Sequence, residues 1–179
     1  DSGGYNIKPT GSMETMKCDM GGAAAVLATI KAVAALGIKK KIIAVAPVCE
    51  NAVSGSAYKP GDILIAYNKK SIEVTNTDAE GRLILADALA YVEEKYKPDV
   101  IIDLATLTGA CVVALGSQIS GIVSPHKELQ ETLQKAGEVS YDRVWPLPLL
   151  EEYKDSMKGS ISDLKNTATT GYGAGTITA

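Results

Sequence analysis

The 179-residue sequence is poor in histidine and cysteine. It has one histidine, His126, and three widely spaced cysteines, Cys18, Cys49 and Cys111. A single histidine excludes a zinc site built on several histidines within the chain, and the lack of a C-x-x-C pair excludes zinc-finger and thioredoxin-type sites. An odd number of scattered cysteines is typical of a reducing compartment and indicates no disulfide framework.

The sequence also lacks a marked excess of charge and a long apolar run. Its net charge is −3 without runs of like charge, so neither a basic nucleic-acid-binding surface nor an acidic tail is indicated. No apolar run reaches the ~18 residues of a membrane span. With 46% apolar and 22% charged residues, we expect one globular domain whose partners are neither nucleic acid nor membrane.

The two ends of the sequence are unusual. It begins with DSGG rather than methionine, carries no signal-peptide pattern, and stops in a run of small residues. Because the first residues have the character of a functional motif, we expect a piece of a longer protein rather than a trimmed terminus.

The apolar pattern alternates between helix and strand. Apolar residues at helical spacing, followed by glycine or proline, predict helices at 21–36, 83–96, 127–136 and 149–158. Short apolar runs predict buried strands at 41–48, 100–107 and 119–123, and two shorter strands within 63–74. This alternation is typical of an α/β fold with a largely parallel sheet, whose ligand crevice lies beyond the carboxyl ends of the strands.

The segment NTDAEGR, residues 76–82, is the most informative. Asp78 and Glu80 lie two residues apart just before a predicted helix, and Arg82 follows them. In an extended turn the two carboxylates point the same way, and a metal ion between them relieves their repulsion. Oxygen ligands suit Mg²⁺, Mn²⁺ or Zn²⁺. The competing interpretation is an acidic first turn, with Asp78 as the helix cap and Glu80 favoured by the helix dipole.

Three further segments carry polar residues beside glycine. Asp1 and Asp19 each precede a glycine pair, and glycine allows close approach of a ligand. Taken alone, Asp19 is explained as an N-cap and Lys8 as a solvated surface lysine. Residues 103–110 run from a predicted strand into small polar residues, where an α/β sheet places a substrate-contacting loop. The alternative there is an ordinary turn.

Together these segments resemble the catalytic domain of the leucyl (cytosol) aminopeptidase family, peptidase family M17. NTDAEGRLIL, residues 76–85, resembles the family signature throughout, and DSGG, MKCDMGGAAAV and DLATLTGA follow the family's order and spacing. The resemblance implies a three-layer α/β/α zinc-peptidase-like domain with a central, largely parallel mixed sheet. It covers residues 1–179 as one catalytic domain, truncated at both ends and without the family's N-terminal domain.

The resemblance also implies roles for particular residues. Two divalent metal ions, Zn²⁺, Mn²⁺ or Mg²⁺, would be bound by the carboxylates of Asp1, Asp19, Asp78 and Glu80. Asp1 and Glu80 are the candidates for bridging both ions. Lys8 and Arg82 would be catalytic, with a bicarbonate ion beside Arg82 as general base. The residues implied in substrate binding are Lys8, Met16, Asp19, Thr106, Leu107 and Gly109. The family's further metal-binding lysine lies upstream of the DSGG aspartate, before residue 1.

The implied activity is the metal-dependent removal of an N-terminal residue, leucine-like by preference, from peptides by a cytoplasmic homohexamer. One alternative is a catalytically incomplete fragment, or a non-enzymatic binding or scaffold protein that binds DNA, against which the net charge of −3 argues. Another is a different metal-dependent hydrolase such as a phosphatase, against which the lack of a phosphate-cradling loop argues.

Overall fold

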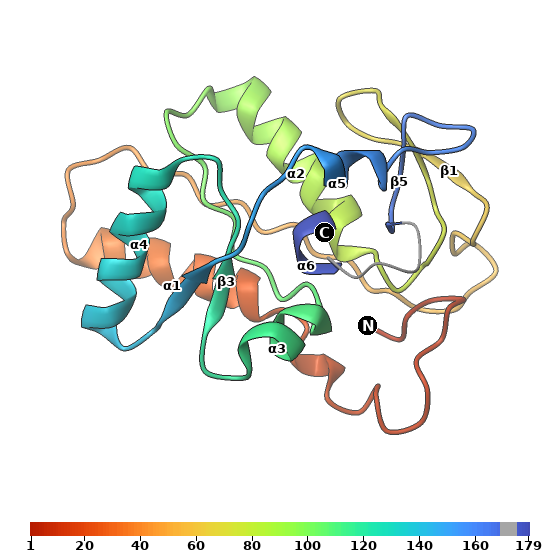
Figure 1. Cartoon of the computed structure of the whole chain (residues 1–179), viewed down its shortest axis with the longest axis horizontal. Helices are drawn as coiled ribbons and strands as arrows, with labels where there is room; N and C mark the ends of the chain where they lie inside the picture. The colour runs from red at the N-terminus through yellow and green to blue at the C-terminus, as the bar shows by residue number, and fades with distance from the viewer. Residues whose placement is uncertain (169–174) are drawn as a thin grey trace. The chain divides into compact units, whose positions relative to one another are not determined.

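The computed structural model describes residues 1–168 and 175–179 (Figure 1). The chain forms two compact units. The first unit consists of residues 1–107 and 159–166. The second consists of residues 108–158 and the described residues from 167 onward. Since the first unit holds nearly all of the predicted site residues, its construction matters most here.

Two α-helices of the first unit follow the segments that carry acidic residues. A short 3-10 helix, η1 (Met16–Cys18), precedes α1 (Gly21–Ala35), and α2 (Gly81–Tyr96) follows the NTDAEGR segment. Alanine-rich sequence favours α1, and Lys97, in the left-handed conformation before a proline, ends α2. Both predicted helices are confirmed, with α2 starting two residues earlier than predicted, at Gly81.

The first unit also contains a three-stranded mixed sheet. Its strands are β1 (Ile63–Ile65), β2 (Ser71–Glu73) and β5 (Leu164–Lys165), in the order β1-β2-β5. The β1–β2 pairing is antiparallel and the β2–β5 pairing is parallel. The two short strands predicted within 63–74 are therefore confirmed, and the turn between them places Lys69 at a positive φ of 71°.

The core of the first unit is small and centres on β2 and the loop after it. The buried apolar side chains are Ala66, Ile72, Val74 and Ala79. Three polar side chains are buried with them: Asn51, Thr77 and Asn166. Because a buried polar group must find hydrogen-bond partners, these three residues mark the places where separate segments are joined.

Asp163 joins the segment before β5 to β2. Its Oδ2 accepts hydrogen bonds from the Ser71 N–H and Oγ, both at 2.8 Å, and these bonds hold the pKa of Asp163 below its ordinary value of 3.8. An acid with a lowered folded-state pKa stabilises the protein above its unfolded pKa, and this stabilisation is lost as the pH falls through the folded value.

We expect Asp163→Asn to lower the thermal midpoint slightly at pH 7, because a neutral amide oxygen is a weaker acceptor than a carboxylate. The difference from the unmodified protein should shrink as the pH falls below 3.8, the ordinary pKa of this carboxyl. Thermal unfolding followed by circular dichroism across this range measures it. A difference that stays constant in acid would contradict the expectation.

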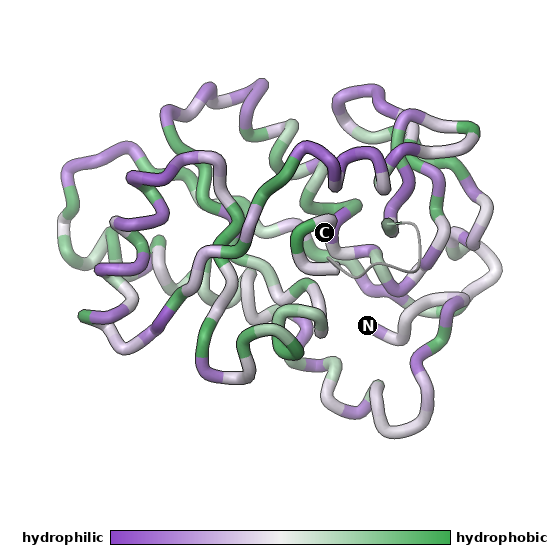
Figure 2. Tube along the Cα trace, in the orientation of Figure 1, coloured by the Kyte–Doolittle hydropathy of each residue, from purple (hydrophilic) through white to green (hydrophobic). Residues whose placement is uncertain are grey.

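The second unit contains four helices among its described residues. They are α3 (Gly109–Leu115), α4 (Lys127–Ser140), α5 (Glu152–Asp155) and α6 (Gly175–Thr178). Its two strands, β3 (Ser120–Ile122) and β4 (Val144–Pro146), pair in parallel with α4 as the connection between them. The strand predicted at 119–123 is confirmed. Much of the α4 trace is hydrophilic (Figure 2).

The predicted end of the helix at residue 136 is wrong, because α4 continues through Gly137 to Ser140. Gly137 is buried, and a Cβ there would lie 2.7 Å from the Asp142 carbonyl oxygen. Glycine is therefore needed at position 137 because the backbone of Asp142 passes close to it. It does not end the helix. Tyr141, with φ of 66°, takes the left-handed position after the helix instead.

Three other predicted elements differ in the described structure. Residues 41–48 and 100–107 are not strands there, and the helix predicted at 149–158 is reduced to α5. The predicted burial on both faces is also absent, since Ile42, Val100 and Ile102 are exposed. Apolar β-branched residues favour a strand, but a strand forms only where a neighbouring strand supplies ladder hydrogen bonds.

One segment meets the length and hydropathy of a membrane span. Met16–Ala35, which joins η1 and α1, has 20 residues and a mean hydropathy of 1.4. The expectation that no apolar run is long enough to span a membrane therefore has this one exception among the described residues, by length and composition only. The segment contains two lysines and Asp19, and Asp19 belongs to a cluster of acidic side chains.

Candidate metal centre

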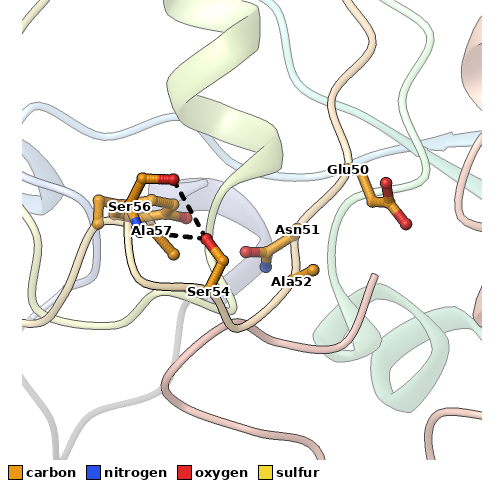
Figure 3. Close-up of a pocket in the computed structure, with 7 residues that line it drawn as sticks. Glu50, Asn51, Ala52, Ser54, Ser56 and Ala57 are labelled. Carbon is orange, nitrogen blue, oxygen red and sulfur yellow. Dashed lines mark hydrogen bonds between the residues drawn. The ribbon is translucent and has the colours of Figure 1, made fainter.

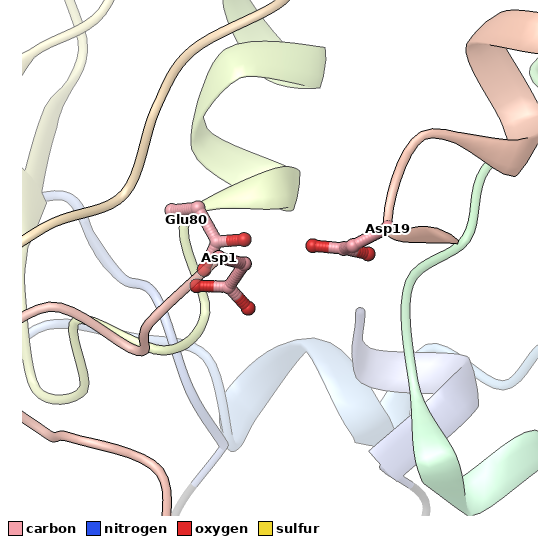
Figure 4. Close-up of side chains that lie close together, drawn as sticks. All are labelled: Asp1, Asp19 and Glu80. Atoms are coloured by element: carbon pink, nitrogen blue, oxygen red, sulfur yellow. The ribbon is translucent and has the colours of Figure 1, made fainter. Parts of the chain in front are cut away.

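Three carboxylates meet in the first unit. Asp1, Asp19 and Glu80 each offer an oxygen atom, and these atoms all lie within 4.8 Å of one another. Figure 4 shows the three side chains pointing toward one another from the chain start, from the turn before α1 and from the start of α2. Three half-buried carboxylates at this distance repel one another, so the arrangement fits a divalent cation with oxygen ligands.

Lys8 connects this cluster to the fourth predicted acid. Its Nζ lies 2.9 Å from Asp1 Oδ2 and 2.7 Å from Asp78 Oδ1. Asp78 thus lies on the far side of the lysine and is not part of the three-carboxylate group. The ammonium ion supplies positive charge between two of the acids, and only 14% of its side chain is exposed. The interpretation of Lys8 as a solvated surface lysine is therefore wrong.

The helix-cap alternatives for the acids also fail in the described structure. The residue at the N-cap of α1 is Met20, and no side chain caps that helix end. Glu80 is at the N-cap of α2, where its side chain makes no capping hydrogen bond. Asp19 and Asp78 therefore do not cap these helices, whereas Glu80 does lie at the N-terminal end of α2, where the helix dipole favours a carboxylate.

The electrostatics of the site follow from burial and like charge. Burial raises the pKa of Glu80, and the nearby Asp19 and Asp78 raise it further, while Lys8 opposes them. Burial lowers the pKa of Arg82, which Glu80 partly offsets. Arg82 Nε is buried and has no hydrogen-bond partner among the described residues. A buried guanidinium donor without a partner fits a small anion such as bicarbonate beside Arg82.

The DSGG segment is bent to bring its aspartate to the cluster. Gly3 and Gly4 both have positive φ, 85° and 64°, a region that glycine enters without strain. The Gly3 N–H donates to Asp1 Oδ1 at 2.8 Å, and the Thr77 Oγ1 hydroxyl donates to the Gly3 carbonyl at 2.6 Å. Asn6 N–H donates to Thr77 Oγ1, and Thr77 N–H donates back to Asn6 Oδ1. These bonds fix residues 1–6 against the NTDAEGR loop.

Asn166 fixes the start of the same loop. Its Oδ1 accepts from the N–H groups of Thr75 and Asn76 at 2.8 and 3.2 Å. Its Nδ2 donates to the carbonyl oxygens of Asn76 at 2.6 Å and Ala79 at 3.3 Å. One side chain thus satisfies four backbone groups of residues 75–79, the segment that contains Asp78. Sequence reasoning missed Asn166, since nothing in its neighbourhood in the sequence indicates this partner.

The predicted substrate-binding residues lie on several elements. Thr106 Oγ1 accepts from the Gly22 N–H at 3.1 Å, which places Thr106 at the start of α1. Leu107 lies against Gly81 at the start of α2, and Met16 begins η1. Gly109 is the first residue of α3, in the second unit. Their contacts with substrate stay predictions.

A hollow that the sequence did not indicate lies beside the cluster, with Asn51 in its lining. Its volume is about 520 Å³, and the residues that line it are Glu50, Asn51, Ala52, Ser54, Ser56, Ala57 and Tyr58 (Figure 3). Burial, with Glu80 nearby, raises the pKa of Tyr58 to about 12, so its hydroxyl stays protonated and donates to the Thr77 carbonyl at 2.8 Å. This loop therefore braces the NTDAEGR segment.

Fold and site together define an α/β domain with a cluster of three carboxylates that fits a divalent cation. The chain belongs to the cytosol aminopeptidase family, since the family's catalytic domain matches residues 1–179. Two curated relatives are each 51% identical over 179 residues, from Chlorobaculum tepidum and Geobacter sulfurreducens, and both are named “Probable cytosol aminopeptidase”. The match covers 100% of this chain and 35% and 36% of the relatives, respectively, so the chain spans about a third of their length.

A solved structure is similar in sequence and in fold. Leucyl aminopeptidase from Leishmania major, solved in complex with actinonin, superposes with a TM-score of 0.90 and 36% sequence identity. The match covers 99% of this chain and 35% of that protein. The predicted α/β fold class and the predicted family are therefore confirmed.

Proposed function

We propose that this chain carries the catalytic centre of a metal-dependent aminopeptidase that removes the N-terminal residue of peptides, with leucine-like residues preferred. The observation that carries the proposal is the convergence of Asp1, Asp19 and Glu80, with Lys8 between Asp1 and Asp78. Membership of the cytosol aminopeptidase family supports the same activity. The whole protein would work in the cytoplasm as a homohexamer, as the family resemblance implies.

Two divalent ions, Zn²⁺, Mn²⁺ or Mg²⁺, would be held by the carboxylates of Asp1, Asp19, Asp78 and Glu80. Bound there, such ions would polarise the scissile carbonyl and lower the pKa of a water molecule. The three-carboxylate group fits one cation directly. Asp78 would join as a ligand by exchanging its ion pair with Lys8, whose Nζ now lies 2.7 Å from Asp78 Oδ1.

Lys8 and Arg82 would supply the positive groups of the reaction. Lys8 donates toward oxygen atoms at the edge of the cluster, where it would stabilise negative charge that develops on the substrate carbonyl oxygen. Arg82 has a buried Nε without a partner in the part of the chain that the structure describes, and it would hold bicarbonate as the proton acceptor. Met16, Asp19, Thr106, Leu107 and Gly109 would contact the substrate.

The test is the release of leucine from a leucyl chromogenic amide, with chelator and then with added Mn²⁺. We expect hydrolysis that stops with the chelator and returns with Mn²⁺. Hydrolysis that continues undiminished in chelator, or no hydrolysis by the metal-loaded protein, would overturn the proposal. A phosphatase substrate and a DNA gel shift at physiological salt, run in parallel, should both be negative.

A further inference from the structure

Asn51 lies at the junction of the segments that carry the metal-centre acids. Its side-chain Nδ2 donates to Asp1 Oδ1 at 2.8 Å and to Glu80 Oε2 at 3.1 Å. The same nitrogen donates to the Thr77 carbonyl at 3.0 Å. Its backbone carbonyl accepts from the Ser2 N–H at 2.9 Å and from Ser2 Oγ at 2.8 Å.

The chemistry of these contacts fixes the orientation of the amide. All three partners of Nδ2 are oxygen acceptors, so only the NH₂ end of the side chain can face them. The nitrogen has two hydrogens for three acceptors, and one hydrogen is therefore shared. Asn51 is 6% exposed, and a buried donor set of this kind is strong because water does not compete for it.

A neutral donor is what this position requires. Asp1 and Glu80 carry like charges, and a hydrogen bond to each carboxylate holds one oxygen of each in place without adding charge. The hydrogen bonds from Asn51 go to Asp1 Oδ1 and Glu80 Oε2, and Asp1 Oδ2 pairs with Lys8. An acid at this position would add a further like charge, and an apolar side chain would remove the amide that bonds to both carboxylates.

We propose that Asn51 is a positioning residue of the metal centre, which sets the separation of Asp1 and Glu80 through one shared amide nitrogen. The inference rests on the proposed function, because it concerns the same centre. Asn51 touches no metal or substrate in this role and acts only through the two carboxylates. Removing the partner that orients a ligand typically weakens metal binding by 10–100-fold.

The experiment measures Mn²⁺ affinity of the protein directly, from the decrease in the EPR signal of the free ion on titration. We expect Asn51→Ala and Asn51→Ser to raise the dissociation constant for Mn²⁺ by about 10–100-fold. The serine variant keeps a small polar group, so it serves if the alanine variant does not fold. Circular dichroism of the metal-free variants establishes that they are folded.

Tyr58→Phe is the matched control. Tyr58 donates to the same Thr77 carbonyl as Asn51 does, but it bonds neither Asp1 nor Glu80. We expect its Mn²⁺ affinity to stay within about twofold of the unmodified protein.

Three results would overturn the inference. The first is unchanged affinity in a folded Asn51 variant, and the second is an equal loss in Tyr58→Phe. The third is no Mn²⁺ binding by the unmodified protein, which also overturns the proposed function. If the unmodified protein binds Mn²⁺ and the Asn51 variants bind it more weakly, yet the metal-loaded unmodified protein does not hydrolyse a leucyl amide, the inference stands and the proposed function alone fails.

Discussion

Glu80→Gln is expected to abolish most metal binding, with the dissociation constant for Mn²⁺ raised roughly 1,000-fold, which corresponds to about 4 kcal/mol. The substitution keeps the shape of the side chain but removes one of the three charges that converge in the cluster. A neutral amide oxygen is a poor ligand compared with a carboxylate, and the other two acids of the three-carboxylate cluster, Asp1 and Asp19, would no longer enclose a cation. Leucyl amide hydrolysis should fall with the metal content.

The metal-free protein should respond differently. Glu80 lies among like charges, with Asp19 and Asp78 both raising its pKa. Removing the charge relieves this repulsion, so the unfolding midpoint without metal should be equal to or above that of the unmodified protein. Weaker Mn²⁺ binding together with an unchanged or higher unfolding midpoint is expected of a metal ligand. Substitution of a residue that only supports the fold would lower both the affinity and the midpoint.

Glu94→Gln is the matched control for the charge itself. Glu94 is exposed near the other end of α2, so this variant removes the same charge from the same helix away from the cluster. Its Mn²⁺ affinity should be unchanged. Equal Mn²⁺ affinity in Glu80→Gln and in the unmodified protein, measured by the same titration, would contradict the assignment of Glu80 as a ligand.

Gly22→Ala is expected to lower the free energy of unfolding by about 2 kcal/mol, the middle of the range for overpacked sites. Helix propensity alone predicts the reverse, since alanine is better than glycine in a helix by about 1 kcal/mol. A Cβ at Gly22, however, would overlap the Leu104 carbonyl oxygen and would lie 2.6 Å from Ala105 Cα. Backbone atoms cannot move aside as a side chain does, so the clash outweighs the propensity.

Gly22→Ala should also weaken metal binding at the acidic cluster. Moving α1 away from residues 104–106 breaks the hydrogen bond from Gly22 to Thr106 and displaces the turn that carries Asp19. We therefore expect weaker Mn²⁺ binding together with the loss of stability. Urea unfolding gives the stability and the EPR titration gives the affinity.

Gly55→Ala is the control for adding a methyl group. A Cβ at Gly55 meets nothing within 4 Å among the described residues, and its φ is not positive. This variant should change stability by no more than a gain of about 0.4–1 kcal/mol, from the reduced entropy of the unfolded chain. If Gly22→Ala has the same free energy of unfolding as the unmodified protein, α1 is not held closely against residues 104–106.

Local patterns predicted the elements that depend on local sequence. The helical spacing in 21–36 and 83–96 and the short hairpin around Asn68 all appear in the structure. The family motifs predict Asp1, Asp19, Asp78 and Glu80 as metal ligands, and the structure brings Asp1, Asp19 and Glu80 together. Residues 41–48 and 100–107 failed as predicted strands, because strand formation depends on a partner elsewhere in the chain.

The buried amides were beyond sequence reasoning for a related reason. Asn51 and Asn166 have roles set by partners 26 to 91 residues away, and no periodicity records such contacts. Gly137 was misinterpreted as a helix end, although its true constraint is the nearby Asp142 backbone. In each case a tertiary contact determines which residue is needed. The local sequence shows only the residue type, asparagine or glycine, which has several other common explanations.

The hydrogen bonds between Asn166 and the loop at Thr75 have a consequence for synthesis of the chain. The two residues are 91 positions apart, and residues 108–158 of the second unit lie between them. Closing a loop of this length costs about 4 kcal/mol of chain entropy. A ribosome that adds about 5–20 residues per second needs on the order of ten seconds to pass from Thr75 to Asn166. During that interval the nascent loop that carries Asp78 and Glu80 has no Asn166 to satisfy its backbone, and it is exposed to proteases and chaperones.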